Sequence, residues 1–245
     1  MTTKRFAIAL AAAALLAAPI GAAADTVRMG TEGAYPPYNF INDDGEIDGF
    51  ERELGDKICE LAALDCTWVK NDWDSIIPNL VSGNYDTIIA GMSITAERDE
   101  VIDFTAAYMP PDPSSYVALA GAEETVTLGV VAAQTNTIQA GYVAESGATL
   151  LEFATPDETI AAVRAGEVDA VLADRDFLAA QVAESGGELI FVGEDVMLGD
   201  GIGIGVRESD TELKAKLDAA IATLKADGSL TAMIKKWFER DVVFE

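Results

Sequence analysis

The chain has 245 residues, half of them apolar, and carries 42 acidic against 16 basic side chains and no histidine. The formal charge of −26 makes nucleic acid and anionic membrane surfaces poor partners. Without histidine, and with only two cysteines, the chain lacks the common zinc-binding sets and any nucleophile activated by histidine. We therefore expect no catalytic residue, no metal site and no cofactor.

The first 24 residues have the pattern of a secretory signal peptide. Lys4 and Arg5 precede an apolar run of 13 residues from Phe6 to Ala18, and alanines at positions 22 to 24 form a cleavage site. Because a helix needs roughly 20 apolar residues to span a bilayer, this run is too short for an anchor. We expect cleavage near Ala24–Asp25 and a freely diffusing periplasmic chain.

Cleavage would leave 14 basic against 42 acidic residues, a formal charge of −28. Adaptation of the surface to salt and attraction of cationic solutes both explain such a charge. The two cysteines, Cys59 and Cys66, lie close together in the exported part. In an oxidising compartment such a pair favours a disulfide over two buried thiols.

The mature chain alternates strand-like and helix-like segments. Short apolar runs predict strands, and apolar residues spaced three or four apart predict helices. In chain order, the predicted segments are a strand at 27–30, a hairpin of 39–41 with 47, a helix over 54–62, a strand at 67–69, a helix over 76–81, a strand at 86–90, a strand at 127–132, a helix through 138–142, a helix from 156 to 166, a strand at 168–173, a helix at 175–184, a strand at 189–192 and helices over 210–240. This alternation predicts an α/β fold with mainly parallel sheets flanked by helices.

Two segments interrupt the alternation and predict two lobes. One contains three prolines, and the other contains glycines at positions 201, 203 and 205. The glycine spacing is not G-x-G-x-x-G, so it favours a hinge strand with tight backbone approach over a nucleotide-binding loop. The expected division is a signal peptide at 1–24, a first lobe at 25–110 and 203–245, a second lobe at 114–197, and hinge crossings at 109–115 and 197–203.

An arginine follows the strand predicted at 86–90. In open parallel sheets, ligands bind beyond the carboxyl ends of the strands. Arg98 there offers a two-pronged partner for a carboxylate, with the hydroxyl of Ser93 nearby. The alternative is a solvated helix arginine among acidic neighbours.

Two later strand ends and two aromatic residues are further candidates. The loop around Gln134 and Thr135 precedes a helix start, which either binds an anion or is an ordinary polar cap. Asp174 either holds an ammonium group or caps the next helix. Tyr35 and Trp73 either enclose an apolar ligand stem or belong to the core.

Several motifs occur in order along nearly the whole mature chain. They are Gly-Thr-Glu-Gly-Ala-Tyr-Pro-Pro-Tyr at 30–38, Gly-Phe-Glu at 49–51, Asp-Trp-Asp at 72–74, Ser-Ile-Thr at 93–95 with Arg98, Asp-Phe-Thr at 103–105, and the ending 224–230 with Lys-Trp-Phe at 236–238. In these motifs the chain resembles the family 3 solute-binding proteins of polar amino-acid ABC transporters. The resemblance implies a type II periplasmic-binding-protein fold that closes on one free L-amino acid and delivers it to an ABC permease. We expect a monomer that binds no nucleic acid.

The resemblance also assigns the two polar ends of an amino-acid ligand. It implies that Arg98 grips the α-carboxylate, with help from Thr135. It implies that Asp174 takes the α-ammonium, together with the backbone carbonyl of Gly91 and the hydroxyl of Ser93.

The rest of the implied site surrounds the ligand's side chain. Tyr35 and Trp73 flank its stem, and Glu32 meets its head group. Ala90 and Gln134 complete the set of expected ligand-binding residues. Ala90 and Gly91 have no side-chain hydroxyls, and in this the chain resembles glutamine-binding proteins as much as proteins that bind basic amino acids.

The ligand class follows from Glu32. A carboxylate there compensates its desolvation best with a cation, so arginine, lysine or ornithine is preferred to glutamine or another neutral polar amino acid. Acidic ligands would be repelled. Two other functions stay open: an enzyme similar to periplasmic cyclohexadienyl dehydratases, and a soluble chemosensory co-receptor.

Overall fold

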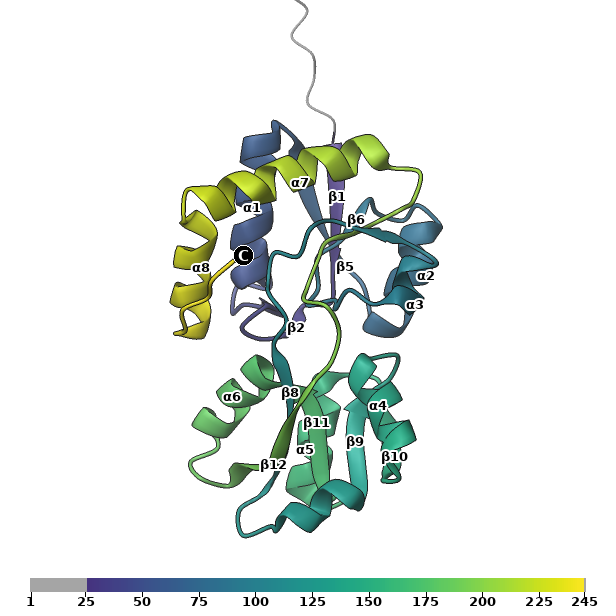
Figure 1. Cartoon of the computed structure of the whole chain (residues 1–245), viewed down its shortest axis with the longest axis vertical. Helices are drawn as coiled ribbons and strands as arrows, with labels where there is room; N and C mark the ends of the chain where they lie inside the picture. The colour runs from purple at the N-terminus through teal and green to yellow at the C-terminus, as the bar shows by residue number, and fades with distance from the viewer. Residues whose placement is uncertain (1–25, 245) are drawn as a thin grey trace, which may run out of the picture.

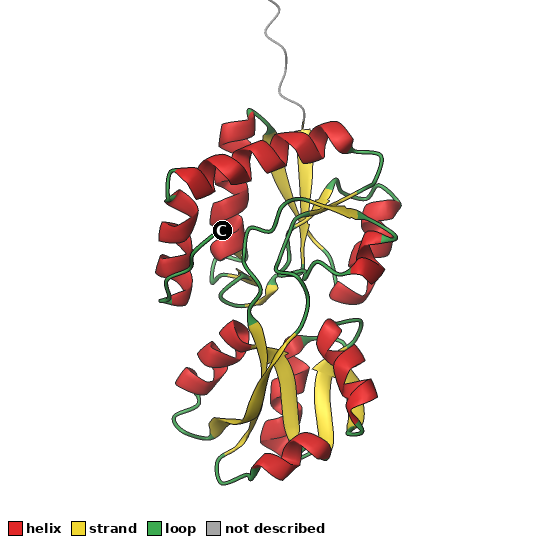
Figure 2. Cartoon of the chain, in the orientation of Figure 1, coloured by secondary structure: helices red, strands yellow, loops and turns green. Residues whose placement is uncertain are grey.

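The structure, a computed structural model, describes residues 26–244. The expected signal peptide and its cleavage point lie outside these residues. Between Thr26 and Phe244, no helix is long and apolar enough to cross a membrane. The chain forms two lobes stacked along the long axis of the molecule (Figure 1), and each lobe is a sheet flanked by helices (Figure 2).

The first lobe is built on a five-stranded sheet with the order β5-β1-β6-β13-β7. Its strands are β1 (Thr26–Thr31), β5 (Asp65–Lys70), β6 (Thr87–Ile88), β7 (Asp103–Phe104) and β13 (Gly205–Val206). The expected hairpin belongs to a small antiparallel sheet of β2 (Ala34–Tyr35), β3 (Asn39–Ile41) and β4 (Ile47–Asp48).

The second lobe is built on a five-stranded sheet with the order β10-β9-β11-β8-β12. Its strands are β8 (Pro113–Leu119), β9 (Val130–Gln134), β10 (Thr149–Phe153), β11 (Ala170–Asp174) and β12 (Leu189–Met197).

Helices cover both sheets. The first lobe carries α1 (Phe50–Ala62), α2 (Ile76–Val81), α3 (Ala96–Asp99), α7 (Thr211–Ala226) and α8 (Ser229–Phe238), and the second carries α4 (Ile138–Ser146), α5 (Pro156–Ala165) and α6 (Arg175–Glu184). Short 3-10 helices lie at Trp73–Ser75 and Glu124–Leu128. After the chain has returned to the first lobe, α7 packs on α1 and α8 (Figure 1).

Apolar side chains on α1 and α7 show why these helices pack on the first sheet. Leu54 and Ile58 of α1 and Leu217 and Ile221 of α7 are fully buried. Their spacing of four residues places each pair on one helix face. Burying such a side chain contributes about 1.5 to 3 kcal/mol.

Each sheet is mainly parallel, as the sequence predicts. In the second sheet β8 pairs antiparallel with both of its neighbours, β11 and β12. In the first sheet β13 does the same with β6 and β7. The remaining four strands of each sheet therefore point the same way, and the reversed strand is the first one after the chain enters from the other lobe.

The second sheet differs from the predicted elements in three places. β8 was not predicted, because its first residue, Pro113, belongs to the segment expected to be a connector. Proline is tolerated as the first residue of a strand, so the strand can begin there. β10 was not predicted either, because it is an edge strand with little buried surface and its apolar pattern is weak. The strand expected at 127–132 begins at Val130, because residues 124–128 form a 3-10 helix.

The two crossings between the lobes lie side by side. Met109 of the first forms an antiparallel bridge with Ile202 of the second. Gly201 has a φ of 95°, and a Cβ there would lie 2.6 Å from the Met109 carbonyl oxygen. The expected tight backbone approach is therefore present, and only glycine fits it. The exact domain boundaries stay a prediction.

The expected disulfide is confirmed. Cys59 of α1 is bonded to Cys66 of β5, with a Cα–Cα distance of 6.2 Å. The bond ties a helix of the first lobe to the edge strand of its sheet.

Candidate functional site

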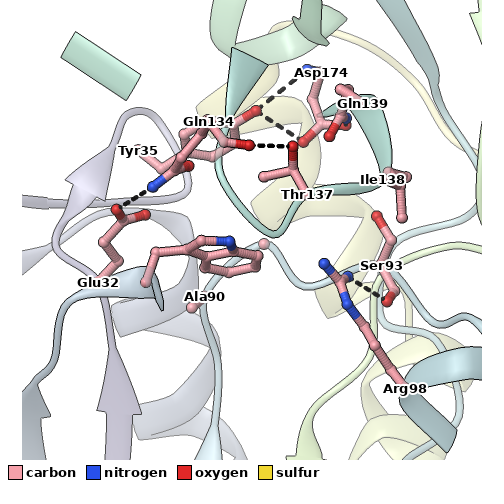
Figure 3. A pocket seen from close by; sticks show the side chains of 12 residues that line it. Glu32, Tyr35, Ala90, Ser93, Arg98, Gln134, Thr137, Ile138, Gln139 and Asp174 are labelled. Atoms are coloured by element: carbon pink, nitrogen blue, oxygen red, sulfur yellow. Dashed lines mark hydrogen bonds between the residues drawn. The ribbon is translucent and has the colours of Figure 1, made fainter. Parts of the chain in front are cut away.

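A cavity lies between the two lobes. Nine of the ten residues expected from the sequence line it, and they come from both lobes (Figure 3). The exception is Thr135. Three further residues, Thr137, Ile138 and Gln139, also line the cavity and were not expected.

Arg98 presents a guanidinium group at one end of the cavity. It lies in α3, whose N-cap residue Thr95 accepts a hydrogen bond from the Arg98 backbone N–H. One terminal nitrogen donates to the Ser93 carbonyl at 2.8 Å, and the other donates to the Asn136 carbonyl of the second lobe at 3.1 Å. Burial lowers the pKa of Arg98 to about 10. Among the described residues it forms no ion pair, so the cation is available for an anionic group.

Asp174 provides a partly buried carboxylate at the end of β11. Its Oδ2 accepts from the Tyr35 hydroxyl at 2.8 Å, and its Oδ1 accepts from Gln139 Nε2 at 2.8 Å. Asp174 is the N-cap residue of α6, yet its side chain makes no capping hydrogen bond. The carboxylate therefore serves the cavity and not the helix end. Burial raises its pKa to about 6.

Glu32 provides a second carboxylate, from the turn that follows β1. It is 4% exposed, and its Oε1 accepts from Gln134 Nε2 of the second lobe at 2.7 Å. The same nitrogen also donates to the Ala154 carbonyl at 3.1 Å. Burial raises the pKa of Glu32 to about 7, although the hydrogen bond from Gln134 lowers it.

Two aromatic side chains form apolar walls. Tyr35 is stacked on Phe177 of the second lobe, with ring centroids 4.4 Å apart and planes 11° from parallel. Trp73 lies under the Arg98 guanidinium at 5.5 Å from its ring centroid. Both rings also line the cavity, so they belong to the core and to the site at once.

The first-lobe backbone after β6 lines the cavity at Ala90, Gly91 and Ser93. Gly91 has a φ of 62°, which favours glycine, and a Cβ there would meet the Tyr35 ring at 3.5 Å.

Thr137 lies where sequence reasoning expected Thr135. It is the N-cap of α4, and its Oγ1 accepts from the backbone N–H of Ala140 at 3.2 Å. A threonine directly before the first apolar residue of a helix is a standard helix-start signal, so this pattern at Ile138 would have found it. Gln139 gave no comparable signal, since its contact with Asp174 joins distant parts of the second lobe.

The cavity thus combines one guanidinium, one buried and one partly buried carboxylate, and two aromatic walls. Such an arrangement pairs with charges on a ligand, because buried charges are stabilised by partners of opposite sign. Across residues 26–244 there is no group of three or more acidic or cysteine side chains arranged to hold a metal ion.

A two-lobed α/β fold with a polar cavity between the lobes defines the type II periplasmic binding proteins. Residues 27–240 match the sequence profile of the bacterial extracellular solute-binding proteins, family 3. The chain therefore belongs to this family and is a periplasmic solute-binding protein.

Known relatives agree with this assignment. The L-arginine-binding protein of Pseudomonas aeruginosa is 32% identical, covering 94% of this chain and 95% of that protein. The lysine/arginine/ornithine-binding periplasmic protein of Escherichia coli is 32% identical, covering 89% of both chains. A periplasmic His/Glu/Gln/Arg/opine family-binding protein from Silicibacter pomeroyi, solved in complex with lysine, is 73% identical with a TM-score of 0.86, covering 89% of this chain and all of that one.

Proposed function

We propose that this protein captures a free cationic L-amino acid between its lobes and delivers it to an ABC permease for uptake. The observation that carries the proposal is the charge arrangement of the cavity. One guanidinium and two separate carboxylates match a molecule with one carboxylate and two cationic groups. The names of its relatives, which bind arginine, lysine or ornithine, support the same ligand class.

Arg98 is the proposed partner of the α-carboxylate. Its side chain lines the cavity, and no ion pair of residues 26–244 includes it. Thr137, at the start of α4, replaces Thr135 as the proposed second contact, since it lines the cavity and Thr135 does not.

Asp174 is the proposed partner of the α-ammonium. Its two oxygens already accept from Tyr35 and Gln139, and a carboxylate has further acceptor capacity for a third donor. The backbone carbonyl of Gly91 and the hydroxyl of Ser93 are the remaining proposed acceptors.

The far end of the cavity favours a cationic head group over an amide. Both N–H groups of Gln134 are used, one by Glu32 and one by Ala154. Within the described structure, Glu32 Oε2 and Gln134 Oε1 accept no hydrogen bond, so this end offers acceptors. An ammonium or guanidinium group has only hydrogen-bond donors, so it can pair with these acceptors. The amide oxygen of a bound glutamine is itself an acceptor and would find no donor here. Leaving that buried oxygen unpaired costs about 1 to 3 kcal/mol.

Closure of the lobes is part of the proposal. Three contacts join the lobes around the cavity: Gln134 to Glu32, Tyr35 to Asp174, and Arg98 to the Asn136 carbonyl. These contacts form only when the lobes are shut, so a ligand that touches both lobes favours the closed state. We expect small-angle scattering to show a smaller radius of gyration at saturating lysine than without ligand. An unchanged radius would contradict closure.

A binding role, and not catalysis, is proposed. The enzyme alternative is a periplasmic dehydratase, and turnover of prephenate or arogenate would establish it. The co-receptor alternative would be supported by lysine-dependent binding to a chemoreceptor. We also propose that the protein is a monomer. It should have no nucleic-acid partner, because its charge of −26 repels polyanions.

A thermal-shift screen tests the ligand class. A ligand that binds only the folded state raises the melting temperature. Among the twenty amino acids, ornithine and citrulline, we expect the largest increases with lysine, arginine or ornithine. A response to glutamine or citrulline alone would contradict the cationic preference, and no response at all would contradict amino-acid capture.

A further inference from the structure

Glu51 is a buried acid that does not touch the cavity. It is the second residue of α1, is 0% exposed, and is absent from the cavity lining. Among the described ion pairs none involves it, and burial raises its pKa. A fully buried carboxylate without a cation is costly, so its hydrogen-bond partners must stabilise it.

Three donors from separate segments meet at this carboxylate. Oε1 accepts from the backbone N–H of Gly91 at 2.6 Å and from the Tyr108 hydroxyl. Oε2 accepts from Asn39 Nδ2 at 2.7 Å. Asn39 is also fully buried, and its Oδ1 accepts from the backbone N–H of Gly33 at 2.7 Å.

Both ends of this chain of hydrogen bonds belong to the ligand site. Gly33 directly follows Glu32, and Gly91 lines the cavity floor. The third donor, Tyr108, precedes Met109, whose backbone pairs with the other crossing at Ile202. One carboxylate therefore connects the head-group end of the site, the cavity floor and the entry to a hinge crossing.

The direction of the hydrogen bonds is fixed. The groups at the two ends, Gly33 and Gly91, are backbone N–H donors, which cannot become acceptors. Asn39 must therefore turn its oxygen to Gly33 and its nitrogen to Glu51. Position 51 must then accept on both of its oxygens, which a carboxylate does and a primary amide does not.

We propose that Glu51 is a positioning residue for ligand binding. Glu51 does not touch the ligand. Through Asn39 it holds the turn that carries Glu32, which receives the cationic head group, and through the Gly91 N–H it holds the cavity wall that receives the α-ammonium. This inference rests on the proposed function, since it concerns the same site.

Glu51→Gln tests the inference, because it keeps the shape and places a donor against the Asn39 amide. We expect it to weaken lysine binding at least about tenfold in calorimetry of the folded protein. Adding Asn39→Asp restores the pattern, since the amide at position 51 then donates to a carboxylate at position 39. We expect the double variant to recover lysine affinity to within about threefold of the parent. A role limited to stability would lower the melting temperature of Glu51→Gln and leave the lysine affinity of its folded form unchanged.

Hydrogen exchange separates failure of this inference from failure of the proposed function. In ligand-free protein, hydrogen exchange of the Gly33 and Gly91 amides should be faster in Glu51→Gln and slow again in the double variant. If the parent does not bind lysine, the proposed function fails, whereas the exchange rates still test the network. If the parent binds lysine and Glu51→Gln binds it equally well, the positioning role is wrong.

A tyrosine pair covers the case in which Glu51→Gln does not fold. Tyr108→Phe removes one donor to Glu51, and Tyr85→Phe removes a matched buried donor to the Ile76 carbonyl, away from this network. We expect Tyr108→Phe to weaken lysine binding at least about threefold and Tyr85→Phe to leave it unchanged. Equal affinities for the two variants would overturn the proposal.

Discussion

The two lobes contribute to the cavity in different ways. The first lobe carries the two groups at the ends of the cavity, the Arg98 cation on α3 and the Glu32 carboxylate on the turn after β1, and hydrogen bonds within that lobe brace both segments. The second lobe supplies Asp174 and the start of α4, which reach the first lobe only through the interlobe contacts. Under the proposed function, the first lobe sets the length and charge of the ligand, and the second lobe completes the site on closing.

The largest expected effect is the loss of the first-lobe anchor. Arg98→Ala should weaken lysine binding by about 2 to 5 kcal/mol, or roughly thirtyfold to a few thousandfold, because a desolvated carboxylate loses its charged partner. Arg98→Lys should not restore binding, since an ammonium lacks the two-pronged geometry. Arg164→Ala is the matched control, because this arginine of α5 pairs with Glu188 and does not line the cavity. Calorimetry showing less than about a threefold change for Arg98→Ala would remove Arg98 from the site.

The next effect concerns the head-group end. Glu32→Gln removes the charge that pairs with a cationic head, so lysine affinity should fall by about tenfold to a hundredfold while glutamine affinity changes less. Glu46→Gln, at the exposed hairpin turn, should change neither. Equal losses for lysine and glutamine would show that Glu32 does not read the head-group charge.

The pH dependence compares carboxylates of both lobes. Burial raises the pKa of Glu32 to about 7 and that of Asp174 to about 6. A cation binds the ionised forms, so lysine affinity should rise with pH between 5.5 and 8, by up to about tenfold per pH unit for each proton released. Glu32→Gln should flatten the upper part of this profile in calorimetric titrations. A lysine affinity of the parent protein that does not change with pH would contradict the raised pKa values of Glu32 and Asp174.

The same pKa shifts predict the opposite trend for stability. A carboxyl whose folded pKa is raised stabilises the fold below its unfolded pKa, and this contribution is lost as the pH rises through the folded pKa. Glu32 and Asp174 should therefore lower the melting temperature of the ligand-free protein at pH 8 relative to pH 5.5. Saturating lysine should reduce this difference.

The smallest effect on binding is expected at the disulfide. Cys59 and Cys66 enclose a short loop in the first lobe, and neither lines the cavity. Replacing both by alanine should lower the unfolding free energy by about 2.5 kcal/mol, from the loop entropy of eight residues. Lysine affinity should change less than about threefold. A large affinity loss in the folded variant would show that the bond shapes the site itself.

The sequence predicted the fold and most of the site because their signals are local. Apolar periodicity predicted α1, the capping pattern at Thr155 predicted the start of α5, and the motif around Arg98 predicted a residue that lines the cavity. β8 was missed because its first residue, Pro113, looks like part of a connector.

The parts that sequence patterns did not predict depend on contacts between distant segments. Gln139 meets Asp174 only after the second sheet has formed, and Glu51 meets Gly91 and Asn39 only in the folded first lobe. The spacing of polar residues along the chain contains no information on such partners. Thr137 is different, since its helix-start pattern was present in the sequence.

Calorimetric titration of the exported protein with lysine and, separately, with glutamine at pH 7.5 tests the central claim most directly. The charge arrangement predicts saturation of one site per chain by lysine, with a dissociation constant of about 10 μM or below. Glutamine should bind at least about tenfold more weakly, because its amide oxygen meets only acceptors. Tight glutamine binding without heat from lysine, arginine or ornithine would contradict the claim that Glu32 and Gln134 select a cation.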